Sequence, residues 1–219
     1  MHSKHFAAAA GLLIAASGAQ AALSIGGLTF DDKAYADRLI SSAGDYTVSG
    51  PSLAAALTDQ DLSTWATSMT PGARVVLGFT DNVVVNGPGN DLALFEVGHE
   101  AYEYSQEGFD SFDITINGIT RTYFTTETTT IVDDHNVNMT TLDLSFFGIA
   151  EGASIKQVQI GMDFDTRGSR PQLQLVAAIH SGPVAAVPEP QTYALLAAGL
   201  GLVAFAARRS TARKTGRRA

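Results

Sequence analysis

The sequence predicts an all-β protein, an antiparallel β-sandwich or jelly roll, with an N-terminal signal peptide and a single C-terminal transmembrane helix. Three observations predict this. Short segments alternate apolar and polar residues, turns rich in Gly, Asn and Asp divide them, and an apolar run stands near each end of the 219-residue chain. A period of two suits strands that bury one face and expose the other to water.

Residues 1–21 have the composition of a secretory signal peptide. Lys4 supplies a positive start, an apolar run covers residues 6–16, and Ala19-Gln20-Ala21 forms a small-x-small cleavage site. The alternatives are an amphipathic helix and a membrane anchor, but the run is short for spanning a bilayer. We therefore expect export, with cleavage after Ala21.

Residues 22–182 are expected to form one β-sandwich domain. The expected strands are Ala73–Phe79, Leu92–Gly98, Phe112–Gly118, Ile119–Phe124, Thr141–Ile149, Ile155–Phe164 and Gln172–Ile179. The pair Asn117-Gly118 predicts a hairpin turn, because both residues tolerate positive φ. A helix is expected over Lys33–Ser42, and a long polar loop over Thr125–Asn138.

The charge of the chain is divided between its body and its end. Residues 22–187 carry seven Lys/Arg against 21 Asp/Glu, a net charge of −14, whereas six of the 14 basic residues follow Ala207. An acidic body argues against nucleic-acid binding, which needs a basic footprint. The chain has no cysteine, so it has no disulfide framework.

The C-terminal part reads as three consecutive segments. Residues 183–192 form a linker that contains Pro188-Glu189-Pro190, and its prolines keep the backbone extended. Residues 193–207 are uncharged and rich in Leu, Ala and Gly, which predicts a transmembrane helix of about 22 Å. In the basic tail, residues 208–219, Arg208 and Arg209 are expected to stop translocation and to stay in the cytoplasm.

This order of a Pro-Glu-Pro motif, a short apolar helix and a basic end resembles the PEP-CTERM protein-sorting signal of Gram-negative bacteria. The resemblance covers residues 187–219, and its sorting motif falls on Pro188, Glu189 and Pro190. It implies a membrane-embedded exosortase as partner, a transient inner-membrane anchor, and a destination at the outer surface or in the extracellular matrix. It also implies an association with exopolysaccharide and biofilm. The alternative for this segment is a permanent single-pass anchor.

A second resemblance concerns the body. The stretch Ala56–Ala66, ALTDQDLSTWA, followed by the strand at Ala73–Phe79, is similar to part of the galactose-binding-like, discoidin-type jelly rolls. It implies a β-sandwich, a structural calcium ion and sugar contacts at the loops. Calcium would be held by Asp59, Asp61 and Thr64, since calcium prefers several oxygen ligands. The alternative is a turn in which these side chains satisfy backbone N–H groups without metal.

No compact catalytic motif stands out, so we expect no enzyme activity and assign no catalytic residue. His99, His135 and His180 are isolated along the sequence and lack zinc-helix spacing. Asn90 and Asp91, after Gly87-Pro88-Gly89, suit either an oxygen-ligand loop or plain turn chemistry, with the turn favoured.

The function expected is therefore that of an exported, non-catalytic surface or matrix protein with an adhesive or carbohydrate-contacting role. The alternative is a secreted carbohydrate-active hydrolase that uses paired carboxylates, whose separation cannot be read from a sequence.

Overall fold

The structure is a computed structural model that describes residues 22–100, 110–162 and 170–184. The predicted signal peptide, sorting motif, transmembrane helix and basic tail lie outside these residues. The strands are β1 Leu23–Ile25, β2 Leu28–Phe30, β3 Arg38–Ala43, β4 Tyr46–Val48, β5 Ala66–Ser68, β6 Arg74–Gly78, β7 Asn82–Val85, β8 Leu92–Glu100, β9 Ser111–Ile116, β10 Ile119–Phe124, β11 Thr126–Val132, β12 His135–Leu142, β13 Ser154–Ile155, β14 Gln157–Gly161, β15 Leu173–Ala178 and β16 Ser181–Pro183. The helices described are α1 Leu53–Thr58 and the 3₁₀ turn η1 Leu144–Phe147.

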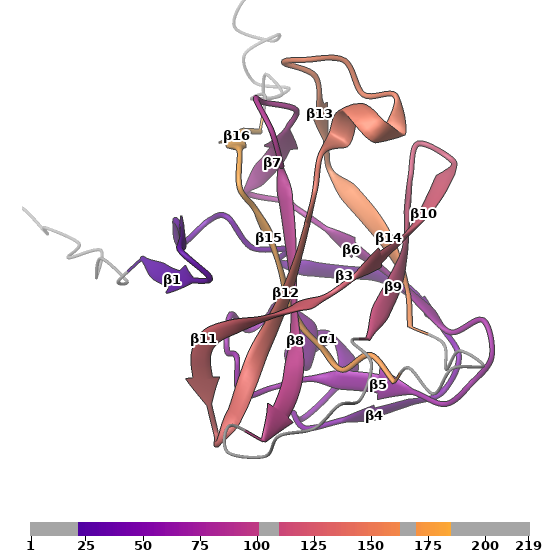
Figure 1. Cartoon of the computed structure of the whole chain (residues 1–219). Coiled ribbons are helices and arrows are strands. Elements are labelled where there is room, and N and C mark those ends of the chain that lie inside the picture. The colour runs from indigo at the N-terminus through magenta and orange to yellow at the C-terminus, as the bar shows by residue number, and fades with distance from the viewer. Residues whose placement is uncertain (1–21, 101–109, 163–169, 185–219) are drawn as a thin grey trace, which may run out of the picture. The chain divides into compact units, whose positions relative to one another are not determined.

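Two antiparallel sheets dominate the described part of the chain (Figure 1). One has five strands in the order β10-β9-β14-β6-β3, and the other has six in the order β11-β12-β8-β15-β5-β4. A small sheet, β13-β7-β16, and the β1–β2 hairpin complete the fold. The prediction of an all-β, antiparallel sandwich is confirmed.

The main hydrophobic core lies between the two large sheets. Val75, Ile114 and Ile160 come from the five-stranded sheet, and Leu94 and Val176 come from the six-stranded sheet. Residues of this kind alternate with outward-facing ones along β9 and β14, as the period-two pattern predicts. Their burial stabilises the sandwich by about 1.5–3 kcal/mol for each fully buried side chain.

A second core covers the other face of the six-stranded sheet. Ala93 and Phe95 of β8 lie here, and Phe30 of the β1–β2 hairpin packs edge-to-face on Phe95 with ring centroids 5.4 Å apart. Leu92 and Leu94 of the same strand face the main core. Strand β8 is therefore buried on both faces, which explains why its sequence is an apolar run rather than an alternation.

The chain divides into two compact units, Met1–Pro183 and Val184–Ala219. Both hydrophobic clusters draw their members from residues 23–179, so the first unit carries its own core and can be studied as a separate domain. Among the residues described, no helix has the length and apolar character to cross a membrane.

The helix predicted over Lys33–Ser42 is wrong. This segment holds an isolated bridge at Tyr35 and then strand β3, which pairs with β6. The apolar residues suggested one helical face, but Tyr35 belongs to the second core while Leu39 packs against the main core. The helix that does form, α1, begins after Ser52, whose side chain accepts a hydrogen bond from the Ala55 N–H.

Two other segments differ from their predicted conformation. The expected loop Thr125–Asn138 is largely the hairpin β11–β12, whose polar sequence reflects an exposed edge strand, and Asp133 and Asp134 adopt positive φ at its turn. The expected strand Thr141–Ile149 ends at Leu142, because the Asp143 side chain caps η1 instead. The hairpin turn at Asn117-Gly118 is confirmed.

Candidate functional site

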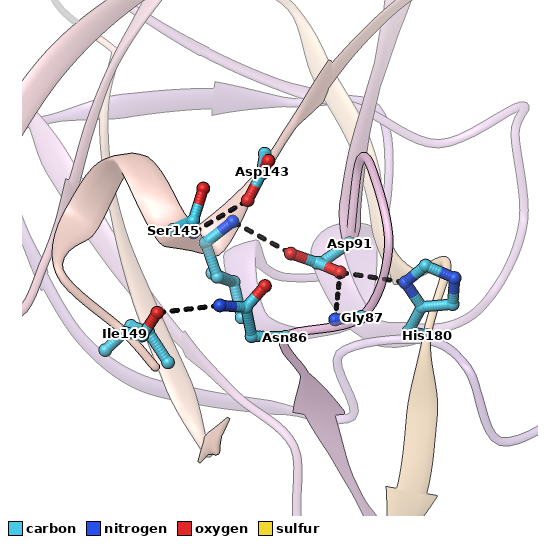
Figure 2. A network of polar contacts seen from close by, with 8 residues as sticks. Asn86, Gly87, Asp91, Asp143, Ser145, Ile149 and His180 are labelled. Atoms are coloured by element: carbon cyan, nitrogen blue, oxygen red, sulfur yellow. Dashed lines mark hydrogen bonds and ion pairs between the residues drawn. The ribbon is translucent and has the colours of Figure 1, made fainter. Parts of the chain in front are cut away.

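The carboxylate of Asp91 is a buried polar group that hydrogen-bonds to three other segments of the chain (Figure 2). Asp91 lies just before β8, at the end of the loop that follows β7, and its side chain is fully buried. A buried carboxylate is costly unless it is hydrogen-bonded on both oxygens. Its neighbours meet that requirement.

Three N–H donors reach the two oxygens of Asp91. Oδ1 accepts from the Gly87 backbone N–H at 2.7 Å and from His180 Nδ1 at 2.8 Å. Oδ2 accepts from the Leu144 backbone N–H at 2.8 Å. The His180 ring is about one-third exposed, so the pair joins a buried acid to a ring at the surface.

Backbone hydrogen bonds of Asp91 also join the segments that its side chain connects. The Asp91 N–H donates to the Leu142 carbonyl at 2.8 Å, and the Asp91 carbonyl accepts from Ile179 N–H at 2.7 Å. Asn86 Nδ2 donates to the Ile149 carbonyl at 2.7 Å. We call this set, centred on Asp91 and His180, the Asp91 clasp. It ties the β7–β8 loop, the start of η1 and the end of β15 together.

Gly87 is required for this close approach. A Cβ atom built at Gly87 would lie 2.5 Å from His180 Nδ1, a distance that no real side chain tolerates. The clasp therefore uses the glycine-rich turn to bring the backbone N–H of residue 87 to the carboxylate. Chemically this arrangement holds chain segments together, and strand β16, which leads toward the sorting motif, begins directly after His180.

The outcome for the predicted residues here is mixed. Asp91 shows the turn chemistry that was favoured over an oxygen-ligand loop. His180 is isolated in the sequence, but the fold pairs it with an acid 89 positions away. No sequence signal could have found this pair, because the separation is closed only by the sheet.

Asp59, Asp61 and Thr64 lie in the turn that follows α1, where their side chains make hydrogen bonds within the turn. Thr64 Oγ1 lies 2.9 and 3.0 Å from the two Asp59 oxygens, and Asp59 Oδ1 accepts from the Asp61 N–H at 3.1 Å. Asp61 Oδ1 accepts from the Ser63 N–H at 2.9 Å. Across the described ranges, no group of three or more Asp, Glu or His side chains is close enough to hold a metal. Calcium at this turn stays a prediction, and it would need backbone carbonyls as further ligands.

A second buried acid, Glu96, lies in the middle of β8. Thr125 Oγ1 and Asn138 Nδ2 donate to its Oε1 atom, the second at 3.4 Å. Burial raises the pKa of Glu96 to about 8, and the charge of Asp110 adds to the rise. The carboxyl group is therefore mainly protonated at neutral pH.

A cavity of about 580 Å³ lies beside β16. Its lining residues are Ala22, Asp31, Asp32, Lys33, Asp81, Asn82, Ser181, Gly182 and Pro183. Burial raises the pKa of Asp81, and the nearby negative charge of Asp37 raises it further. The cavity thus combines three carboxyl groups with one lysine.

An exposed aromatic group lies on the opposite side of η1 from the core. The Phe146 side chain is 57% exposed, and the Arg121 guanidinium lies 5.8 Å from its ring centroid. Arg121 Nε also donates to the Phe146 carbonyl at 3.0 Å. We call Ile119, Arg121 and Phe146 the Phe146 patch, since all three are exposed on β10 and η1.

The tail gives the clearest comparison with known proteins. Residues 186–210 match the family model of the PEP-CTERM protein-sorting motif. The chain carries a PEP-CTERM sorting motif. The matched range includes Pro188, Glu189, Pro190, Arg208 and Arg209. No curated protein matches the chain.

A PEP-CTERM motif implies export through the cell envelope of a Gram-negative bacterium and sorting by an exosortase. The motif covers a small part of the chain, so it identifies the route and not the role of the sandwich.

Proposed function

We propose that this is a non-catalytic protein of the outer surface or extracellular matrix, and that its β-sandwich contacts exopolysaccharide. An exosortase would recognise Pro188-Glu189-Pro190 while residues 193–207 hold the chain in the inner membrane. The observation that carries this proposal is the PEP-CTERM match at residues 186–210.

The use of the acidic side chains supports a non-catalytic role. Both carboxylate oxygens of Asp91 accept hydrogen bonds from backbone or imidazole donors. The Asp37 carboxylate accepts from the N–H groups of Thr80 and Asp81. Carboxylates that are fully engaged by the fold do not serve readily as general acids or bases. These acids position loops, as a binding scaffold requires.

The Phe146 patch supports carbohydrate contact. An exposed aromatic ring offers an apolar face to the C–H groups of a sugar, while the neighbouring Arg121 guanidinium offers hydrogen-bond donors. The net charge of −14 over residues 22–187 repels acidic polymers. A neutral polysaccharide is therefore the favoured ligand.

The sorting step is tested by replacing Pro188, Glu189 and Pro190 with alanine. We expect the variant to accumulate uncleaved in the inner membrane, whereas the native chain loses its basic tail. Mass spectrometry of both termini would measure this. Recovery of an intact Ala219 in native protein from the cell surface would contradict exosortase processing and favour a permanent anchor.

The contact role is tested with purified neutral exopolysaccharide. We expect Phe146→Ala to reduce co-sedimentation several-fold. Met69→Ala is the matched control, because Met69 is similarly exposed at 54% but is not part of the Phe146 patch. Equal retention of both variants and the native domain would contradict a role for the patch.

The alternative is a secreted carbohydrate-active hydrolase. The observation that favours it is the cavity lined by Asp31, Asp32 and Asp81, since glycoside hydrolysis uses two carboxyl groups, one of them with a raised pKa. Release of reducing sugar by the native domain, lost in Asp81→Asn, would establish this alternative and overturn the non-catalytic proposal.

A further inference from the structure

We propose that the cavity beside β16 binds the α-ammonium group that cleavage after Ala21 creates on Ala22. The inference rests on the proposed export route, because that route supplies the cleavage. Before cleavage Ala22 contributes a neutral peptide N–H, and after cleavage it carries a positive charge. Removal of the signal peptide would thus create the charged group that occupies the cavity.

The position of Ala22 carries the first step of this inference. Ala22 is itself a lining residue of the cavity, together with Asp31, Asp32 and Asp81. It directly precedes β1, and the paired β1–β2 hairpin fixes where it lies. The new charged group would therefore lie at the wall of the cavity that the three carboxyl groups also line.

The cavity has an excess of acidic side chains over basic ones. Three acids line the cavity against Lys33, and Asp37 adds a further negative charge, since Asp37 Oδ2 accepts a hydrogen bond from the Asp81 N–H at 3.2 Å. Burial and then the negative charge of Asp37 disfavour ionisation of Asp81, so the pKa of Asp81 is raised. An added ammonium group would relieve that repulsion.

Asn82 supplies an independent observation. It lines the same cavity, it is only 3% exposed, and within the described ranges neither its Oδ1 nor its Nδ2 has a hydrogen-bond partner. Both amide atoms are buried without partners, which is costly, and after a change of side-chain rotamer the oxygen could accept from an ammonium group. The site therefore offers an unused acceptor beside its acids.

An ammonium group fits better than a divalent metal ion. Across the described ranges, no three acidic or histidine side chains converge closely enough to hold a metal. Dispersed carboxyl groups suit a monovalent donor, which can hydrogen-bond to two or three of them in turn. The occupant would also join the N-terminus to the wall formed by β16, the strand that leads to the sorting motif.

The test compares two forms of residues 22–184, one beginning with a free Ala22 and one extended by Gly-Ser-Gly. The extension moves the ammonium group by about 10 Å. At pH 6 we expect the free form to melt about 1–3 °C higher, a modest shift because these carboxyl groups are exposed. Pairing raises the amine pKa, so the stabilisation is present below its ordinary value of about 7.7–8.0 and is lost as pH rises through the raised value.

Variants and a second measurement complete the test. Asp31→Asn, Asp32→Asn and Asp81→Asn together should abolish the melting difference, while the exposed Asp45→Asn, outside the cavity, should retain it. In the native domain we expect acylation of the α-amine at pH 7 to be about threefold slower than for an unstructured peptide, which corresponds to a pKa rise of about half a unit.

Equal melting of the two forms together with an ordinary amine reactivity would overturn the proposal. Stabilisation of both forms by calcium, lost in the triple variant, would also overturn it and identify a cation site instead. Neither measurement uses the exosortase or a polysaccharide, so its failure leaves the proposed function standing. A mature N-terminus other than Ala22 would remove the occupant without affecting the sorting motif.

Discussion

Two buried acids in this domain show how neighbours decide what a carboxyl group does. Asp91 accepts hydrogen bonds from three N–H donors, which offset the cost of its burial. Glu96 meets a hydroxyl and an amide, and burial raises its pKa to about 8. The first acid holds loops together through its hydrogen bonds, and the second is a mainly protonated group inside a sheet.

Asp91→Asn is expected to lower the free energy of unfolding by about 2–4 kcal/mol. An amide can still accept on one oxygen, but its NH₂ group would face an N–H donor of Gly87 or Leu144. Guanidinium denaturation of residues 22–184 would measure the loss. Asp143→Asn is the control, because asparagine caps a helix about as well as aspartate. Equal effects of the two substitutions would contradict the clasp.

Glu96→Gln is expected to remove part of the pH dependence of stability. The folded-state pKa is raised, so the native domain keeps a proton that the unfolded chain releases above about pH 4.3. Its free energy of unfolding should therefore fall between about pH 5 and pH 8, by at most about 1.4 kcal/mol per pH unit, and change no further above that range.

The difference between Glu96→Gln and native protein isolates this group, since all other titrating residues are shared. Denaturation curves at pH 5, 6.5 and 8 would supply it. We expect the free energy of unfolding of the glutamine variant to increase relative to that of the native protein as pH rises. Parallel pH profiles for the two proteins would show that Glu96 ionises normally in the fold.

Two secondary-structure elements, the turn at Asn117-Gly118 and helix α1, depend on residues close together in the sequence. The turn at Asn117-Gly118 forms because both residues adopt positive φ, 52° and 75°, as the twist of a two-residue hairpin requires. Helix α1 is short, so it depends on its N-cap and on packing of Ala56 and Leu57 against the sandwich.

Ser52→Ala is expected to destabilise the domain by about 1 kcal/mol, because the Ala55 N–H loses its acceptor at the start of α1. Ser52→Asp should keep most of the stability, since aspartate caps equally well and its charge suits a helix N-terminus. Thermal unfolding of the three proteins would compare them. A loss as large with aspartate as with alanine would refute the capping role.

The chain as a whole consists of a folded domain, which ends before Val184, and a C-terminal sorting segment. Both hydrophobic clusters lie before Val184, and the matched sorting motif lies after it. We therefore expect deletion of residues 184–219 to leave the melting temperature of the sandwich unchanged within about 1 °C, while it abolishes exosortase processing. Calorimetry and terminal mass spectrometry would check the two effects. A large fall in melting temperature would show that the tail contributes to the core.

Fusion of residues 184–219 to an unrelated exported protein gives the reciprocal test. We expect the fusion to be processed and sorted, since the recognised features are local to the sequence. Failure of the fusion, with normal sorting of the native chain, would mean that the sandwich itself takes part in recognition.

The sequence alone determined the fold class and the sorting motif. Alternation along Phe112–Gly118 depends only on the period of a strand, and the order of motif, apolar run and arginines depends only on neighbouring residues. The same local reasoning was wrong for Lys33–Ser42, where Tyr35 and Leu39 pack on different cores.

The tertiary structure decided what connects distant residues. His180 hydrogen-bonds to Asp91, Thr125 hydrogen-bonds to Glu96, and Ala22 lines the same cavity as Asp81. Such contacts depend on strand order and register, which place residues side by side without regard to their separation in the chain. Local propensity carries no information about that order, because it is set by which apolar faces can be buried together.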